Sequence, residues 1–211
     1  MNYDFKEVPI QVIRGFIETH HYSHNVNGCK VSKCFALYDK DTLVGAILFG
    51  ALSTTAWRRY ALQEKDVVEL RRLVCLDGCP RNTLSWFIAK ALKILKRTTD
   101  HRIVISYADP LYGHVGYIYQ AANWSYVGRT AKDKVYFTPD GKMYHSRALR
   151  TKYKGKYKPF AKKLQEQYVN GELTEKIVPG KHIYVYNLIG RHKRSNKPYP
   201  KGDKTGKDSH L

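Results

Sequence analysis

Two polar sites at the ends of expected strands are where this chain can do chemistry. One is the turn Pro80-Arg81-Asn82-Thr83, which follows an apolar run, and the other is the Asp-Pro step at Asp109. Two parallel strands joined by a helix place a ligand outside their carboxyl ends, so we expect the two sites to meet there. The sequence therefore predicts a cofactor and active site at this edge of a sheet. The alternative explanation of Asp109 is that it only stabilises the Asp-Pro turn.

The periodicity of the apolar side chains predicts the elements that position these residues. Residues 67–76 and 102–108 are expected strands, and Asn82 or Thr83 is expected to cap the helix between them. The other expected helices cover residues 9–20, 116–122 and 159–168, and the other strands cover 124–127, 135–137 and 182–188, with a hairpin around Asp39-Lys40-Asp41.

Arg72 interrupts an apolar strand face. Val68, Leu70 and Val74 alternate on that face, whereas Arg71 falls on the other one. A buried charge without a partner is costly, so we expect Arg72 to meet Asp109 or a bound cofactor. A shift of one residue in the strand would give Arg71 this place instead, and both arginines stay candidates.

The charge of the chain indicates a polyanionic partner. The net charge is +19, and residues 129–211 hold 21 of the 37 basic residues but only 7 of the 18 acidic ones. The chain also has 17 tyrosines and 3 tryptophans, and rings beside cations suit base stacking. We therefore expect a nucleic acid as partner, with a merely solvated basic tail as the alternative.

The order of the expected elements resembles that of the GNAT superfamily of acyl-CoA-dependent N-acetyltransferases. The resemblance implies an α/β (α+β) fold with a mixed central sheet flanked by helices, and acetyl-CoA as the cofactor. In that fold the cofactor pyrophosphate binds backbone N–H groups at a helix N-terminus. The glycine-rich loop typical of the superfamily is replaced here by residues 78–83. The expected cofactor-binding residues are Val74, Cys75, Leu76, Arg81, Asn82 and Thr83.

A more specific resemblance is to the Mom family of bacteriophage DNA-modification proteins. It is carried by His21-Tyr22 and by residues 69–74, 82–85, 106–110 and 113–124. The resemblance implies a transferase that adds an acetamide-like (carbamoylmethyl) group to the N6 amine of adenine in double-stranded DNA, which protects phage DNA from host restriction enzymes. An iron requirement follows from this resemblance alone.

The same resemblance implies roles for single residues. Asp109 would orient or deprotonate the adenine amine, and Tyr119 would be an acid beside the cofactor sulfur, although both also fit structural roles. A base that has swung out of the duplex would meet His21 and Tyr22. Ser85 would lie near phosphate or thioester, or simply cap a helix. The candidate catalytic residues are His21, Tyr22, Arg72, Ser85, Asp109 and Tyr119.

Cationic residues interleaved with aromatic ones are expected to contact DNA. Phosphate contacts position a duplex without identifying its sequence, and exposed rings stack on bases. The candidate DNA-binding residues are Trp57, Arg58, Arg59, Tyr60, Lys152, Lys154, Lys156 and Lys158.

We expect a GNAT-like catalytic domain over residues 1–150, a basic C-terminal extension that packs on or completes it over 151–190, and a disordered basic tail over 191–211. No metal site is predicted. The alternative is a four-thiolate zinc site, but two of the four cysteines fall inside expected strands.

Two other functions fit parts of the sequence. A GNAT-fold N-acetyltransferase acting on a protein or small amine is disfavoured by the basic, aromatic C-terminal part, and a non-catalytic DNA-binding protein is disfavoured by Arg72 and by the acid-tipped strand. No apolar run approaches the ~20 residues that span a bilayer, and the N-terminus lacks a signal-peptide core. We therefore expect no membrane partner and a cytoplasmic location, that of the host cell if a phage encodes the chain.

Overall fold

The computed structural model describes residues 2–52 and 54–202, which form two compact units. One unit joins the chain before Arg129 to the segment after Lys181, and the other consists of Arg129–Lys181. The predicted boundaries at residues 150 and 190 therefore differ from the observed division. The reason is that the chain leaves the first unit after the strand at Ser125–Arg129 and returns to it with the strand at His182–Asn187. Among the described residues, no helix is long and apolar enough to cross a membrane.

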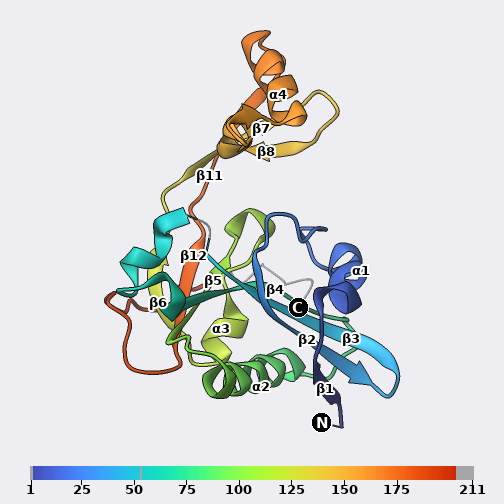
Figure 1. Ribbon diagram of the computed structural model, residues 1–211, viewed down its shortest axis with the longest axis vertical. Coiled ribbons are helices and arrows are strands. Elements are labelled where there is room, and N and C mark those ends of the chain that lie inside the picture. Colours follow the sequence, from blue (N-terminus) through green and yellow to red (C-terminus); the bar gives the residue numbers. More distant parts are fainter. Residues whose placement is uncertain (1, 53, 203–211) are drawn as a thin grey trace. The chain divides into compact units, whose positions relative to one another are not determined.

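The first unit is built on a mixed sheet of seven strands. Their order is β1-β2-β3-β4-β5-β12-β6 (Figure 1). Pairs of neighbours are antiparallel from β1 to β4 and at β5–β12, and β4–β5 is parallel. The strands are β1 (Asp4–Glu7), β2 (Val31–Asp39), β3 (Thr42–Gly50), β4 (Val67–Cys75), β5 (Ile103–Ala108), β6 (Ser125–Arg129) and β12 (His182–Asn187). The short helices of this unit are η1 (Thr54–Arg59), η2 (Glu64–Asp66) and η3 (Pro110–Tyr112).

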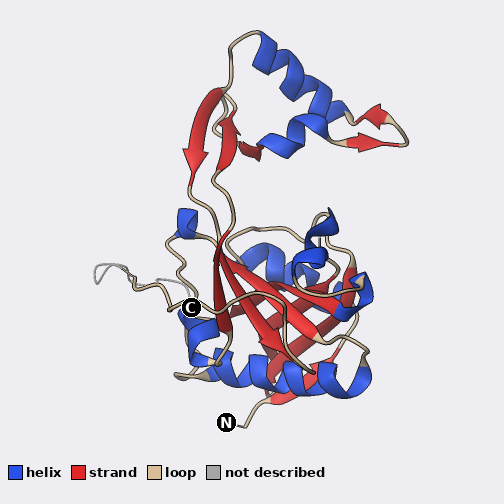
Figure 2. Ribbon diagram, turned by 90° about the vertical axis from the view of Figure 1, so that its left-hand side faces the viewer, coloured by secondary structure: helices blue, strands red, loops and turns tan. Residues whose placement is uncertain are grey.

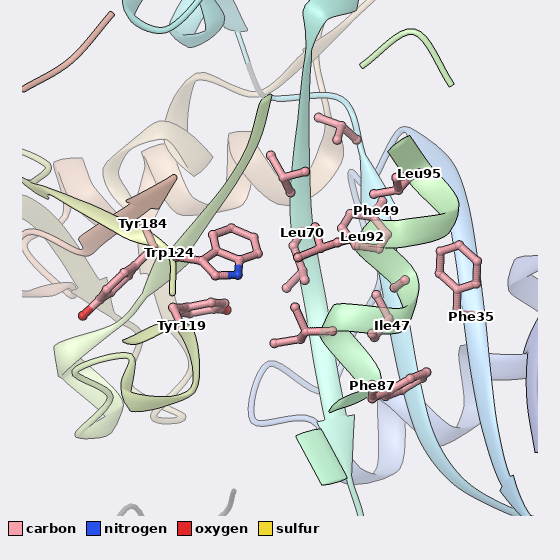
Figure 3. Packing of buried hydrophobic residues seen from close by; sticks show 14 of the residues in the cluster. Phe35, Ile47, Phe49, Leu70, Phe87, Leu92, Leu95, Tyr119, Trp124 and Tyr184 are labelled. Carbon is pink, nitrogen blue, oxygen red and sulfur yellow. The ribbon is translucent and has the colours of Figure 1, made fainter. Parts of the chain in front are cut away.

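One face of the sheet is covered by α2 (Thr83–Thr98). Apolar residues recur at three- and four-residue spacing along this helix, so that Phe87, Leu92 and Leu95 are buried against Phe49 and Leu70 of the sheet (Figure 3). The same cluster continues to α3 (Tyr117–Ala121) through Tyr119 and Trp124. The helix predicted to follow residue 82 is thus confirmed.

The other face is covered by α1 (Ile10–His20), which matches the helix predicted for residues 9–20. Its buried residues Ile13 and Ile17 pack against Ala36, Ala46 and Leu48 of the hairpin β2–β3. The predicted hairpin is confirmed, and Lys40 adopts a positive φ of 54° in its turn. The loop after α1, residues 21–30, lies against β4. Arg72 of that strand contacts the loop.

The parallel strands β4 and β5 diverge after a short pairing. They pair only through Val67–Glu69 and Ile103–Ile105. Beyond this point β4 stays with β3, and β5 stays with β12. At the fork, Ser106 Oγ lies 2.9 Å from the carbonyl oxygen of Leu70. The carboxyl ends of the two strands therefore leave a gap that a ligand can enter.

The second unit combines a three-stranded sheet with one longer helix. Its sheet has the order β11-β7-β8, and the helix α4 lies beside these strands (Figure 2). The predicted helix at 159–168 is confirmed, and the Lys-Tyr-rich segment before it forms a small hairpin, β9–β10. The elements are β7 (Asp133–Phe137), β8 (Met143–His145), η4 (Ser146–Arg150), β9 (Lys152–Tyr153), β10 (Lys156–Tyr157), α4 (Pro159–Val169) and β11 (Thr174–Val178).

Residues 191–202 are ordered against the first unit, so the prediction of a disordered tail is wrong for them. Lys197 N donates to Tyr126 O at 2.8 Å, and Tyr199 Oη donates to Trp124 O at 2.7 Å. Gly202 N donates to Tyr117 Oη at 3.1 Å. These hydrogen bonds hold a segment that has few apolar side chains, whereas residues 203–211 lie outside the described part of the chain.

Candidate active site

A cavity of about 400 Å³ opens where β4 and β5 diverge. Its walls come from the end of β4, the end of β5, the loop after α1, and α3 with the loop before it. Seven of the predicted catalytic and cofactor-binding residues line it: His21, Tyr22, Val74, Cys75, Leu76, Asp109 and Tyr119. Segments far apart in the sequence thus supply one site.

Asp109 is buried in this cavity, with 4% of its surface exposed. Its Oδ1 accepts a hydrogen bond from Leu111 N at 3.1 Å and so caps η3, which confirms the turn-stabilising role. The carboxylate also acts on its neighbours in the cavity. Burial and then the charge of Asp109 raise the pKa of Tyr22 to about 12, so Tyr22 keeps its proton. Asp109 therefore combines a structural contact with a negative charge at the site.

Tyr119 lies at the fork of the two strands. Its hydroxyl is 2.8 Å from Ser106 Oγ, which is itself 2.9 Å from Leu70 O. The single proton of Ser106 can go to only one of these oxygens. When Ser106 donates to Leu70, Tyr119 donates to Ser106, and when Ser106 donates to Tyr119, the proton of Tyr119 is directed elsewhere. Burial raises the pKa of Tyr119, so that its hydroxyl stays protonated near neutral pH.

Four rings gather at one end of the cavity. The ring centroid of Tyr22 lies 4.3 Å from that of His21, 4.7 Å from Tyr112 and 5.1 Å from His114. Tyr22 and Tyr112 are partly exposed, so the group can receive a planar molecule. Tyr112 and His114 were not among the predicted site residues. His114 lies in the segment 113–124 that carries the family resemblance, so this resemblance could have identified it.

A β-bulge decides where the two arginines of β4 point. Leu48 pairs with Arg72 and Phe49 pairs with Leu70, so Arg71 is the extra residue. The bulge reverses the alternation, and the predicted faces are therefore wrong beyond Leu70: Arg72 falls on the α1 side with Val74, and not with Leu70.

Arg72 has polar partners in the loop after α1 and in the bulge of β4 itself. Its Nε donates to Asn25 O at 2.8 Å, and its Nη1 donates to Arg71 O at 2.7 Å. Arg71 instead donates to Ala51 O at 2.8 Å and pairs with Glu69 at 3.3 Å. Arg71 lines the cavity and Arg72 does not, but Arg72 holds the loop that carries His21.

The predicted pyrophosphate turn lies outside this cavity. The lining reaches Asp77 and Leu84 on its two sides, while Arg81 and Asn82 are exposed. Asn82 is the N-cap residue of α2, with a φ of 70°, but its side chain makes no capping hydrogen bond. Thr83 Oγ1 donates to Pro80 O at 2.7 Å.

Ser85 is placed differently from the other catalytic candidates. Its Oγ donates to Asn82 O at 3.0 Å, as expected of a residue in a first helical turn. It lines a second hollow of about 700 Å³ beside α2, together with Trp86 and Lys93. The structure therefore does not bring Ser85 together with Asp109 and Tyr119.

The predicted DNA-binding residues fall in two groups. In the first unit, Arg58 and Arg59 are exposed and Arg58 lies 5.4 Å from the ring of Trp57. Tyr60 is only 2% exposed, because it packs with Val67 and Ile183, so its predicted contact with DNA is wrong.

The second group is the hairpin β9–β10 and the residue after it. All four of its predicted lysines are exposed: Lys152, Lys154, Lys156 and Lys158. Lys152 lies 4.5 Å from the ring of Tyr157, and Lys154 lies 5.6 Å from the ring of Tyr153. This spacing of cations and rings is typical of surfaces that bind nucleic acids.

Metal ligands do not gather in the described part of the chain. No three His, Cys, Asp or Glu side chains in residues 2–52 and 54–202 form a cluster that could hold a metal ion. The four cysteines are free. After burial, the nearby Cys29 raises the pKa of Cys34, and the nearby Cys79 raises the pKa of Cys75. The cysteines therefore lie in two pairs. These residues do not fit the iron that the family resemblance implies, and we derive no step through it.

Comparison with known proteins places this site in context. A sequence model of the Mom protein family matches residues 2–201. The methylcarbamoylase mom of Escherichia phage Mu is 31% identical in an alignment of 155 residues that covers 69% of this chain and 63% of that protein. The chain thus spans less than two thirds of the length of this curated relative.

Solved structures are similar in fold at low sequence identity. The protein smu.2055 of Streptococcus mutans is 11% identical, with a TM-score of 0.50 over 88% of this chain and 99% of that one. The protein yncA of Salmonella typhimurium, solved with its cofactor acetyl-CoA, is 7% identical, with a TM-score of 0.50 over 90% and 96%. An acetyltransferase of the GNAT family from Desulfovibrio desulfuricans is 10% identical, with a TM-score of 0.47 over 88% and 99%. The predicted GNAT-like fold is confirmed.

Proposed function

We propose that this chain, which belongs to the Mom protein family, modifies adenine in phage DNA. The modification is an acetamide-like (carbamoylmethyl) group on N6, and it protects the DNA from host restriction enzymes. Acetyl-CoA is the proposed cofactor and double-stranded DNA the proposed substrate. The observation that carries the proposal is that His21, Tyr22, Asp109 and Tyr119 line one cavity at the fork of β4 and β5.

The residues of the fork fit an acyl-CoA. Beyond Glu69, β4 is not paired with β5. Its backbone on that side can therefore pair with the amide groups of a pantetheine arm. In the first turn of α2, the N–H groups of Leu84 and Ser85 have no backbone partner among the described residues, and such groups bind phosphate well. When bound, acetyl-CoA supplies a two-carbon unit activated as a thioester.

The ring-lined end of the cavity fits a nucleobase. An adenine that has left the duplex can pack against Tyr22 and Tyr112, as flipped bases do in other enzymes. The carboxylate of Asp109 lies beside these rings, since its charge raises the pKa of both tyrosines. Asp109 is therefore placed to accept a hydrogen bond from the N6 amine and to take its proton.

The proton of Tyr119 can serve the other end of the reaction. The hydroxyl lies at the fork, where the thioester of a cofactor on β4 would end, and Ser106 can direct its proton away from Leu70. Tyr119 would then be placed to donate its proton to the sulfur of a cofactor bound there. Making a carbamoylmethyl group from acetyl-CoA needs an added amide nitrogen and a two-electron oxidant for the new bond between the methyl carbon and N6. The described residues supply neither, so we assign to them only the binding of the reactants and the transfer of protons.

The exposed cations support the choice of DNA. Exposed cations in both units can neutralise phosphates. They are Arg58 and Arg59 in the first unit, and Lys152, Lys154, Lys156 and Lys158 in the second. An acetyltransferase for small amines has no need of these surfaces.

The test is mass analysis of nucleosides from cells that express the chain. We expect a heavier deoxyadenosine, whose mass distinguishes a carbamoylmethyl from an acetyl group. Asp109→Asn keeps an oxygen for Leu111 N but removes the charge, so modification should fall about 10²- to 10⁴-fold. Asp41→Asn, in the exposed turn between β2 and β3, is the matched control. Unmodified DNA together with stabilisation by acetyl-CoA would point to another amine as the substrate.

A further inference from the structure

The loop after α1 selects one tautomer of His21. The backbone N–H of Ser23 donates to His21 Nδ1 at 3.1 Å, and Ser23 Oγ lies 2.8 Å from the same nitrogen. A ring nitrogen that accepts from an N–H group carries no proton itself. In the neutral ring the proton of His21 is therefore on Nε2.

The other end of this loop is tied to β4. Asn25 O lies 3.3 Å from Ser23 Oγ and accepts from Arg72 Nε at 2.8 Å. The single proton of the Ser23 hydroxyl can go to only one acceptor, and with Nδ1 unprotonated it is donated to His21 Nδ1. Arg72 is fixed in turn through its bond to Arg71 O in the bulge. The bulge, Arg72, Asn25 and Ser23 thus form one chain of contacts that ends at the His21 ring.

The surroundings keep the ring neutral. His21 is 6% exposed, and its burial is the main cause that lowers its pKa to about 3. The charge of Arg72 on β4 adds to this, as do His114 from the loop before α3 and His24 from the same loop as His21. The ring is therefore neutral, with its proton on Nε2, near neutral pH.

The ring of His21 forms part of the wall of the cavity. Its Nε2 has no hydrogen-bond partner among the described residues. We propose that His21 donates this Nε2–H to an acceptor atom of the bound reactants, and that Ser23 is the positioning residue that fixes the tautomer. A general base or a metal ligand at Nε2 would need a lone pair there, which this tautomer lacks.

The acceptor is an uncharged oxygen or nitrogen, and two reactants contain one. It is the carbonyl oxygen of the acyl cofactor, on which charge develops, or a ring nitrogen of the adenine. The inference rests on the proposed function only for the identity of these reactants. The tautomer itself is a property of the free protein.

The direct test is NMR spectroscopy of the full chain labelled with ¹⁵N in its histidine rings. The His21 signals are those that disappear in His21→Gln. We expect a proton on Nε2, none on Nδ1, and no titration from about pH 8 to about pH 5. Adding acetyl-CoA should shift Nε2 if the acceptor is the acyl oxygen, and adding deoxyadenosine should shift it if the acceptor is the base. A proton on Nδ1, or no shift with either probe, would overturn the proposal.

Variants connect the tautomer to catalysis. Gln places an N–H group near the position of Nε2, so His21→Gln should keep more modification activity than His21→Leu, which should lose about 10²- to 10³-fold in kcat. Ser23→Asp adds a carboxylate that draws the proton to Nδ1 and should lose activity to a similar degree, whereas Ser23→Thr keeps the hydroxyl and should rescue it.

Two outcomes separate this inference from the proposed function. If His21→Gln and His21→Leu are equally inactive in folded protein while the parent modifies DNA, the donor role is wrong and the function stands. If no adduct is found in DNA but Nε2 carries the proton and shifts with acetyl-CoA, the function is wrong and the donor role stands.

Discussion

The buried neutral His21 should make the first unit sensitive to acid in a defined way. In the unfolded chain a histidine has a pKa of about 6.5, whereas in the folded chain the pKa of His21 is about 3. Between these values the unfolded state binds one proton more than the folded state. Stability should therefore fall as the pH drops through this window, and the contribution of His21 should be constant above it.

The magnitude follows from the two pKa values. At about pH 4.5 the unfolded side chain is almost fully protonated and the folded one almost fully neutral, so the difference corresponds to about 3 kcal/mol relative to about pH 8. This is a large part of the stability of a typical domain. Other titrating groups add their own pH dependence, which a comparison of two variants removes.

The assay is urea unfolding followed by tryptophan fluorescence. Trp57, Trp86 and Trp124 are the three tryptophans of the chain, and all of them lie in the first unit. The signal therefore reports the unit that contains His21 and is blind to the unit of residues 129–181. We expect the parent to lose about 3 kcal/mol more than His21→Gln between about pH 8 and about pH 4.5.

Equal losses in the parent and in His21→Gln would refute the reasoning. They would mean that His21 takes up a proton in the folded state, and hence that Ser23 does not hold Nδ1 as an acceptor. A larger loss in the variant would have the same meaning. Ser23→Thr should behave like the parent, since its backbone N–H and hydroxyl are both kept.

Three other perturbations test separate parts of the structure. Tyr119→Phe should lower the rate of modification with little change in KM and destabilise the fold by about 1 kcal/mol, as steady-state kinetics and thermal unfolding will show. Gly116→Ala should destabilise more than Gly141→Ala in thermal unfolding, because both positions have a positive φ but only at Gly116 does the added Cβ clash with the ring of Tyr184. Changing Lys152 and Lys154 together to Gln should lower the slope of log affinity against log salt by about 2 in DNA titrations, with unchanged stability.

Most longer elements of the first unit could be predicted from the pattern of their apolar residues, whereas β1 was not predicted. The α2 stripe at three- and four-residue spacing identifies a helix, and the two β-rich runs around Asp39-Lys40-Asp41 identify the hairpin β2–β3, without tertiary information. Asp109 and Tyr119 were found because a strand end and a motif single them out. Their meeting with His21 and Tyr22 was predictable only through the family resemblance.

The bulge at Arg71 could not be predicted, because a strand with one extra residue looks the same in sequence as a regular strand. It reversed the faces assigned to Arg72 and Leu73. The role of Ser23 was not predicted for a different reason. Its contact with His21 depends on the conformation of a loop, and serines in polar loops are common.

The position of β12 was also invisible, because long-range pairing between β5 and β12 leaves no periodic signal. A strand was predicted at 182–188, but not that it inserts between β5 and β6. The order of residues 191–202 was missed because backbone bonds such as Lys197 N to Tyr126 O need no apolar side chain.

The late arrival of β12 has a consequence for synthesis on the ribosome. A nascent chain that has just completed β6 still lacks the strand between β5 and β6, so those two cannot yet be joined. The second unit is made in this interval, and its local pairings β7–β8 and β9–β10 need nothing from elsewhere. At its base Thr130 N donates to Lys181 O at 2.9 Å, which brings the outgoing and returning strands of the excursion together. The inserted unit can therefore fold first and deliver β12 to its gap, and a chain truncated at residue 150 would be left with an unfilled sheet.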